Sequence, residues 1–114
     1  MGPCGIIGAM CSNYEAVSRA DRLLSFFGVV RDRDDPTATV FPTGMAPFIR
    51  LAEDGSGQRR VHDGAFGLLP YFAKEIAFGR RTYNARTETV ATLPSFRDAW
   101  RRSQRCIIPA ESIF

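Results

Sequence analysis

Apolar residues follow the helical spacing i, i+3, i+4, i+7 in a stretch near the start of the chain: Ala20, Leu23, Leu24 and Phe27. This spacing predicts an amphipathic helix. Ser18 followed by Asp21 reads as a variant of the capping box, so we expect Ser18 to cap the helix. Gly28 is placed to end it, because glycine tolerates the left-handed backbone of a helix C-terminus.

The pattern then changes to β-rich runs separated by turn residues. We expect strands at 37–41, 47–52 and 59–66, a turn at 42–44 and a hairpin loop at 53–57. Residues 67–72 are apolar and interrupted by Pro70, 73–81 predicts a loop, and 82–85 predicts extended chain.

A second helix is expected after Thr92, with Pro94 in its first turn. Phe96 and Trp100 lie four residues apart, so we expect both to face the core while Arg97, Arg101 and Arg102 point outward. A short apolar strand at 105–109 follows.

Together these elements predict an α+β fold with a mixed, mostly antiparallel sheet, curved like a barrel and flanked by helices. A chain of 114 residues is long enough for one small domain. We interpret 1–9 as an N-terminal extension and 10–114 as the N-terminal part of a single domain. We interpret 10–114 as only part of a domain because a domain that stops on the apolar pair 113–114 would leave a strand edge uncovered.

The net charge of +3 says little by itself, but arginines are concentrated between Arg80 and Arg105. That segment holds seven arginines, no lysine and two acidic residues, Glu88 and Asp98. Guanidinium groups bind phosphates with paired hydrogen bonds, so the segment favours a nucleic-acid partner. A solvated helix face explains the same pattern equally well.

Three cysteines and one histidine match no zinc spacing, so we expect neither a metal nor another cofactor. An odd cysteine count favours a reducing compartment, and no apolar run approaches the ~18–20 residues of a membrane span. We therefore expect a cytoplasmic protein, associated with the nucleoid if it is bacterial.

Candidate chemistry begins at Cys11, which directly follows Met10. If the preceding residues are removed, Cys11 carries an α-amine beside its thiol, and the two together can close a five-membered thiazolidine ring on an aldehyde. An internal cysteine cannot do this, because its nitrogen is an amide. The alternative is that Cys11 is a small buried apolar residue, the common fate of a free cysteine.

A second candidate segment runs from Asn84 to Glu88. Asn84 can orient an amine, Arg86 can hold a phosphate with two hydrogen bonds, and Glu88 can pair with Arg86 or move a proton. If 82–86 is a strand, Asn84 and Arg86 share a face. The alternative is an exposed strand face with a salt bridge.

Other candidates are weaker. Tyr71 and Phe72 are adjacent aromatics that can stack on bases, although such pairs more often belong to a core. His62 is a conceivable general base but is more simply a surface histidine, and Glu111 is a minor candidate acid. We expect Cys4 and Cys106 to be inert.

Three segments in this order and spacing resemble the SOS response-associated peptidase (SRAP) family: Met10 and Cys11, NARTET from Asn84 to Thr89, and CIIPA from Cys106 to Ala110. FPTG from Phe41 and FGLLP from Phe66 add to the likeness. The NARTET string is the most specific piece, and the resemblance covers nearly the whole chain but only about the first half of the family's domain.

The resemblance implies covalent capture of abasic sites in single-stranded DNA. It implies Cys11 as the nucleophile, Asn84 as the residue that orients the amine and sugar, Arg86 on a backbone phosphate, and Tyr71 and Phe72 against neighbouring bases. Asn13 and Glu88 are further expected DNA-contacting positions. The family's peptidase activity would remove the residues ahead of the cysteine.

This chain departs from the family at several points. Ser12 and Asn13 stand where the family commonly has Gly-Arg, and Tyr71 and Phe72 stand where it often has tryptophans. The family's catalytic glutamate would fall directly beyond Phe114, and its histidine later still. Two alternatives therefore remain open: a non-covalent single-stranded nucleic-acid-binding module, and a phage-related peptidase that processes only itself.

Overall fold

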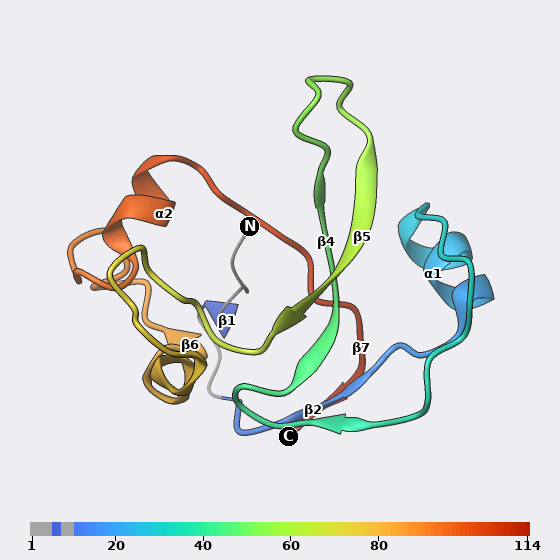
Figure 1. Ribbon diagram of the computed structural model, residues 1–114, viewed down its shortest axis with the longest axis horizontal. Coiled ribbons are helices and arrows are strands. Elements are labelled where there is room, and N and C mark those ends of the chain that lie inside the picture. Colours follow the sequence, from blue (N-terminus) through green and yellow to red (C-terminus); the bar gives the residue numbers. More distant parts are fainter. Residues whose placement is uncertain (1–5, 8–10) are drawn as a thin grey trace.

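The computed structural model describes residues 6–7 and 11–114. In chain order its elements are β1 (Ile6–Ile7), β2 (Tyr14–Ala16), α1 (Ala20–Phe27), β3 (Thr39–Val40), β4 (Met45–Leu51), β5 (Arg59–Ala65), a 3₁₀ helix η1 (Ile76–Arg81), β6 (Asn84–Ala85), α2 (Arg97–Arg101) and β7 (Ala110–Ile113). The α+β class predicted from the sequence is confirmed, with helices far outnumbered by strands (Figure 1).

The described strands form three small sheets rather than one barrel. β4 and β5 make the long antiparallel hairpin, β2 lies between β3 and β7 in an antiparallel sheet, and β1 pairs in parallel with β6. No closed barrel is found among the residues that the structure describes, so the barrel-like curvature stays a prediction. The β4–β5 hairpin stands up from the other elements in Figure 1.

Helix α1 forms where its apolar spacing predicts, but its N-terminal cap was predicted wrongly. The helix begins at Ala20, whose backbone N–H donates to a carboxylate oxygen of Asp34 at 2.7 Å. Ser18 does not cap, and its backbone carbonyl instead accepts a hydrogen bond from the N–H of Asp35. Gly28 ends the helix with a φ of +68°, as expected of a left-handed C-cap.

The remaining element bounds differ from the predictions in instructive places. Residues 73–81 are partly a 3₁₀ helix rather than all loop, α2 is only five residues long, and the last strand starts at Ala110 rather than at 105. Before that strand, Ile107 makes an isolated bridge to Ile49 of β4. The strand β2 was not predicted at all.

Three apolar clusters hold the elements together. The first is Cys11, Tyr14, Ala16, Val40, Ala46 and Phe66; the second is Val17, Leu23, Val29 and Ile49; the third is Ala85, Val90 and Phe96 with Leu68 against it. The first cluster holds Cys11, which precedes β2 in the chain. The third fixes β6, which carries Asn84, against the beginning of α2.

Loop 67–82 is closed at its neck by hydrogen bonds between Leu68 and Thr82. The N–H of Leu68 donates to the carbonyl of Thr82 at 3.2 Å, and the Thr82 hydroxyl donates back to the carbonyl of Leu68 at 2.6 Å. Beside the neck, Gly67 has a φ of +130°, and a Cβ there would lie 2.5 Å from the carbonyl oxygen of Gly79. The backbone approach therefore requires a residue without a side chain at position 67.

Candidate active site at Cys11 and Asn84

The side chain of Asn84 spans the backbone of Cys11, so the two candidate segments meet in space. The backbone N–H of Cys11 donates to Asn84 Oδ1 at 3.3 Å, and Asn84 Nδ2 donates to the carbonyl oxygen of Cys11 at 2.9 Å. The two residues are 73 positions apart in the chain. One amide side chain therefore fixes both the nitrogen and the carbonyl of Cys11.

Cys11 lies in the first apolar cluster, with 3% of its surface exposed. Its thiol lies 3.2 Å from the backbone carbonyl of Asn13, to which it donates. The burial agrees with the alternative that Cys11 is a small apolar core residue, whereas the contact with Asn84 agrees with a nucleophile.

The end of β7 lies beside the residues that follow Cys11. The N–H of Ser12 donates to the carbonyl of Phe114 at 3.0 Å, and the N–H of Phe114 donates to the carbonyl of Asn13 at 3.0 Å. The backbone of Asn13 thus meets both the thiol of Cys11 and the last residue of the chain. Its side-chain oxygen accepts only a long hydrogen bond, 3.4 Å, from the Ser12 hydroxyl.

Tyr14 is the titratable neighbour of Cys11. Its ring packs edge-on against Phe66, with ring centroids 5.1 Å apart, and only 3% of the residue is exposed. Burial, and secondly the charge of a Cys11 thiolate, raise the pKa of Tyr14 to about 12. The phenol therefore stays neutral beside the thiol at any physiological pH.

Arg86 and Glu88 do not form the site that the extended-chain interpretation predicted. Strand β6 ends at Ala85, and the carbonyl of Arg86 accepts hydrogen bonds from Thr89 and Val90 in a turn. The argument that Asn84 and Arg86 share one strand face is therefore wrong. Both Arg86 and Glu88 are exposed, and among the described residues neither takes part in an ion pair.

Tyr71 and Phe72 lie on loop 67–82 and are not core residues. Tyr71 is 87% exposed and Phe72 is 41% exposed. Their rings meet edge-on at 5.4 Å, and Phe72 meets Phe78 of η1 in the same way at 5.7 Å. The guanidinium of Arg81 then lies over the ring of Phe78. Sequence reasoning missed Phe78 and its contact with Arg81, because it assigned 73–81 to a loop.

The weaker candidates have ordinary structural surroundings. His62 stacks at a tilt on Phe48, with centroids 5.7 Å apart. Both oxygens of Glu111 accept hydrogen bonds from Arg22, so this carboxylate joins β7 to α1. Cys4 lies outside the described residues, and the structure assigns Cys106 no role in the site.

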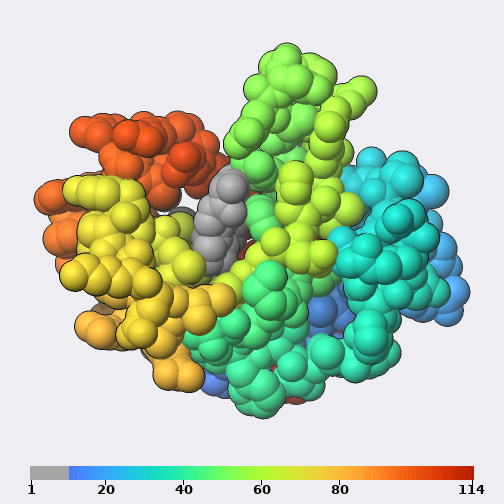
Figure 2. All heavy atoms as spheres, viewed as in Figure 1, coloured from blue at the N-terminus to red at the C-terminus, as the bar shows by residue number. Residues whose placement is uncertain are grey.

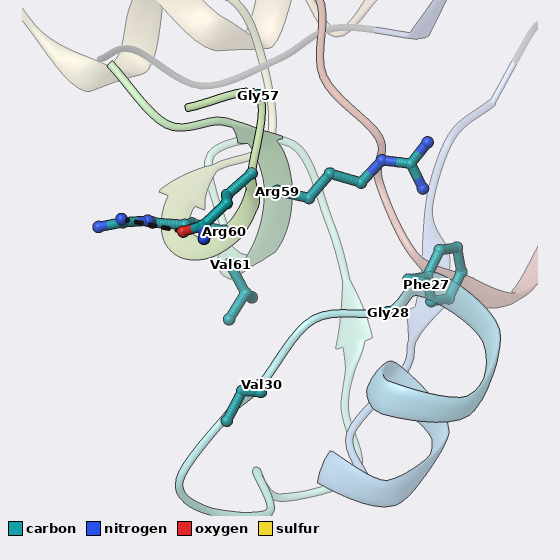
Figure 3. A pocket seen from close by; sticks show the side chains of 8 residues that line it. Phe27, Gly28, Val30, Gly57, Arg59, Arg60 and Val61 are labelled. Atoms are coloured by element: carbon teal, nitrogen blue, oxygen red, sulfur yellow. Dashed lines mark hydrogen bonds between the residues drawn. The ribbon is translucent and has the colours of Figure 1, made fainter. Parts of the chain in front are cut away.

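A hollow of about 770 Å³ lies away from these residues, between the end of α1 and the β4–β5 hairpin. Figure 3 shows its lining, which includes Phe27, Val30, Arg59 and Val61. None of the predicted site residues lines it. In the described part of the chain, no cluster of three His, Cys, Asp or Glu side chains is arranged to hold a metal ion. No helix there has both the length and the apolar character needed to cross a membrane.

Known proteins resemble this chain along most of its length. The family model described as SOS response associated peptidase (SRAP) matches residues 10–114. The abasic site processing protein YobE of Bacillus subtilis is 35% identical over 109 residues, covering 92% of this chain and 48% of YobE. The abasic site processing protein YoqW of Bacillus phage SPbeta is 34% identical, covering 92% of this chain and 47% of YoqW.

A solved structure gives the same answer for the fold. The crystal structure of a Bordetella bronchiseptica protein superposes with a TM-score of 0.74 at 34% identity, covering 90% of this chain and 49% of that one. The chain therefore spans about half the length of the relatives that it matches.

Proposed function

Because the chain belongs to the SOS response associated peptidase family, we propose that it captures abasic sites in single-stranded DNA covalently, through Cys11 as the first residue of the processed chain. The similar proteins of B. subtilis and phage SPbeta are named abasic site processing proteins, which supports this class of substrate. The proposal assigns the reacting atoms to Cys11 and the orienting side chain to Asn84.

The observation that carries the proposal is the pair of hydrogen bonds between the Asn84 side chain and the backbone N–H and carbonyl of Cys11. When the peptide bond before Cys11 is cleaved, the amide nitrogen becomes an α-amine, with a reference pKa of about 7.7–8.0. Asn84 Oδ1 would accept a hydrogen bond from that amine, while Nδ2 holds the carbonyl and fixes the rotation about the Cys11 backbone. Such fixed geometry is what a reaction between two bound groups requires.

The chemistry uses both nucleophiles of Cys11. The amine adds to the aldehyde carbon of the ring-opened sugar, and loss of one water gives an imine. The thiol sulfur then adds to the imine carbon, the thiol proton passes to the imine nitrogen, and the five-membered ring closes. One carbon–nitrogen bond and one carbon–sulfur bond form, and the carbonyl oxygen leaves as water, so no oxidant or reductant is needed.

The burial of Cys11 sets the order of events. At 3% exposure the residue is closed to a DNA aldehyde. Removal of the residues before Cys11 would create the amine, and the sulfur would also have to become accessible before the ring could close. We propose that the protein removes them itself, as the peptidase name of the family suggests.

The remaining predicted residues would hold the DNA strand. Tyr71 and Phe72 offer exposed rings for stacking on bases next to the lesion. Arg86 offers a guanidinium free of ion pairs among the described residues for a backbone phosphate. Asn13 and Glu88 would lie at the edge of this surface, and stacking on unpaired bases is the reason to favour single-stranded DNA.

A denaturing gel tests the proposal. The protein beginning at Cys11 is incubated with single-stranded DNA containing one abasic site, and we expect a heat-stable shifted band. Cys11→Ser keeps the amine but removes the sulfur, so the heat-stable band should disappear, and Ser12→Ala serves as the matched control that retains it. A band of equal strength with Cys11→Ser would contradict the thiazolidine.

The burial of Cys11 favours one second candidate, a non-covalent DNA-binding module in which Cys11 only packs. In that case the gel shows no covalent band from the wild type or from Cys11→Ser. The affinity for single-stranded DNA is then unchanged by Cys11→Ala.

A further inference from the structure

Charge is divided unevenly between two parts of the chain. Residues 67–105, here called the basic lobe, contain eight basic and three acidic residues, for a net charge of +5; the other residues contain seven basic and nine acidic ones, for a net charge of −2. The lobe comprises loop 67–82, β6 and α2, which the third apolar cluster joins. Figures 1 and 2 show it on one side of the molecule, with α1 on the opposite side.

The arginines of the two parts also differ in their partners. Outside the lobe, six of seven arginines form ion pairs in the described structure, and Arg59 is the exception. Inside the lobe, two of seven do so, and both share the single carboxylate of Asp98. Five exposed guanidinium groups of the lobe thus have no carboxylate partner among the described residues: Arg80, Arg81, Arg86, Arg97 and Arg105. A surface of this kind suits a polyanion.

One of these arginines stacks on the single tryptophan of the sequence. The guanidinium carbon of Arg105 lies 4.2 Å from the centroid of the Trp100 ring, and Trp100 is 37% exposed. The stack is built by a reversal of the chain after α2. Ser103 has a φ of +53°, its N–H donates to the carbonyl of Trp100, and the N–H of Gln104 donates to the carbonyl of Ala99. These are the two hydrogen bonds of a Schellman motif, which returns Arg105 over the helix.

The stack is connected to the candidate active site through the third apolar cluster. Asn84, which holds Cys11, is followed by Ala85, and Ala85 packs with Phe96 in the third apolar cluster. Trp100 lies one helical turn beyond Phe96, and its N–H donates to the carbonyl of Phe96 at 2.9 Å. Leu68, near the start of loop 67–82, packs against the same cluster.

We propose that Trp100 and Arg105 form a second base-stacking platform for single-stranded DNA, separate from Tyr71 and Phe72. This inference rests on the proposed function for the identity of the polymer. A planar guanidinium lying on an indole offers a flat cationic surface to a nucleobase, and the neighbouring arginines Arg97, Arg101 and Arg102 lie within the same short segment for phosphates. Arg101 and Arg102 share one carboxylate, which leaves positive charge in excess there.

The ligand is argued from the two kinds of surface together. Phosphate alone would need the arginines but not the indole, and an apolar partner would need the rings but not five unpaired guanidinium groups. Single-stranded DNA uses both, because its bases stack while its backbone carries one charge per nucleotide. The bound strand would run across the basic lobe from Tyr71 to Trp100.

Emission from Trp100 tests the platform directly. Oligothymidine without abasic sites is titrated into the full chain, binding is followed by anisotropy of a labelled strand, and the signal of Trp100 is isolated as the emission difference between wild type and Trp100→Phe. We expect this emission to be quenched in parallel with binding. Binding without any change in Trp100 emission overturns the proposal, as does the absence of binding.

Matched arginine variants supply the second arm. Arg105→Ala removes a stacked guanidinium, and Arg59→Ala removes an exposed one outside the lobe that has no ion pair in the described part of the chain, so both variants lose one charge. We expect Arg105→Ala to weaken binding at least about fivefold and Arg59→Ala to weaken it less than twofold. Arg105→Lys keeps the charge but not the planar group, so it should also weaken binding. Equal effects of Arg105→Ala and Arg59→Ala overturn the proposal.

The outcome is separable from that of the covalent proposal. Quenching by oligothymidine with no abasic-site crosslink leaves the platform standing and removes the covalent function. A crosslink to abasic DNA with no quenching of Trp100 emission leaves the covalent function standing and removes the platform.

Discussion

Replacement of Asn84 by alanine removes both hydrogen bonds that span Cys11. A hydrogen bond of this type contributes about 1 kcal/mol net, so the loss of two amounts to about 2 kcal/mol. If this free energy serves to hold the amine and carbonyl of Cys11 for reaction, the rate of crosslinking falls about 30-fold. The Asn84 variant should therefore be slow rather than inactive.

Asn84→Asp is the matched variant, because it has nearly the same size and shape. It keeps an oxygen that can accept from the nitrogen of Cys11, but it places a second oxygen against the Cys11 carbonyl in place of an N–H donor at 2.9 Å. The carboxylate would also hold a proton on the neighbouring amine and so remove its nucleophilic lone pair. We expect Asn84→Asp to react at least as slowly as Asn84→Ala.

The assay is a single-turnover crosslinking time course with the protein that begins at Cys11 and abasic single-stranded DNA in excess. Thermal denaturation confirms that each variant is folded, and anisotropy with intact single-stranded DNA measures non-covalent affinity, which should stay within twofold of wild type. A folded Asn84→Ala variant that crosslinks at the wild-type rate would refute the reasoning. So would a loss that appears wholly in affinity.

Three further variants test the local structure by measurements of unfolding. Gly67→Ala should lower the free energy of unfolding by more than about 2 kcal/mol, because its Cβ would meet the Gly79 backbone at 2.5 Å at a φ of +130°; Gly79→Ala, with its nearest such contact at 3.5 Å, should cost less than half as much in the same urea titration. In wild type the unfolded chain ionises Tyr14 from pH 10, whereas the folded chain keeps the proton up to about pH 12. The contribution of Tyr14 to the free energy of unfolding is therefore fully present below pH 10, and the free energy falls by up to about 3 kcal/mol between pH 10 and 12. A Tyr14→Phe variant with the same pH dependence would contradict this. Ser103→Gly should raise the free energy of unfolding by about 1 kcal/mol, since glycine adopts the φ of +53° without strain, and an unchanged melting temperature would argue against it.

The parts of the fold that local pattern determines were predictable. The apolar stripe of α1, its end at Gly28 and the β4–β5 hairpin depend on residues that are neighbours in the sequence. The cap of α1 was not predictable in this way, because Asp34 reaches the helix from a loop 14 residues away. A tertiary contact there replaces the local capping box that Ser18 suggested.

The two aromatic residues of α2 illustrate a limit of periodicity. Phe96 and Trp100 have the same spacing and both were predicted to face the core, yet Phe96 is 8% exposed and Trp100 is 37% exposed. Phe96 packs against Ala85 and Val90, and the short helix carries Trp100 beyond that cluster. Spacing gives the face of a helix, but it does not say how far the core extends along that face.

The candidate site was likewise only partly predictable from the sequence. The resemblance implied that Asn84 orients Cys11; the two lie at hydrogen-bond distance, and their roles stay predictions. The shared face of Asn84 and Arg86 was inferred from an extended chain that in fact turns after Ala85. The stack of Arg105 on Trp100 depends on a chain reversal at Ser103, whose φ of +53° is in the left-handed region. No residue pattern in the sequence predicts that reversal.

The attachment site and mass of the DNA adduct test the central claim most directly. The protein beginning at Cys11 is reacted with an abasic oligonucleotide and treated with borohydride, and the crosslinked peptide is identified by mass spectrometry. We predict an adduct on the first residue whose mass is that of peptide plus DNA less one water, unchanged by borohydride and with its sulfur closed to alkylation. An adduct on an internal residue, or a first-residue adduct that borohydride reduces while its thiol remains open to alkylation, would contradict the account.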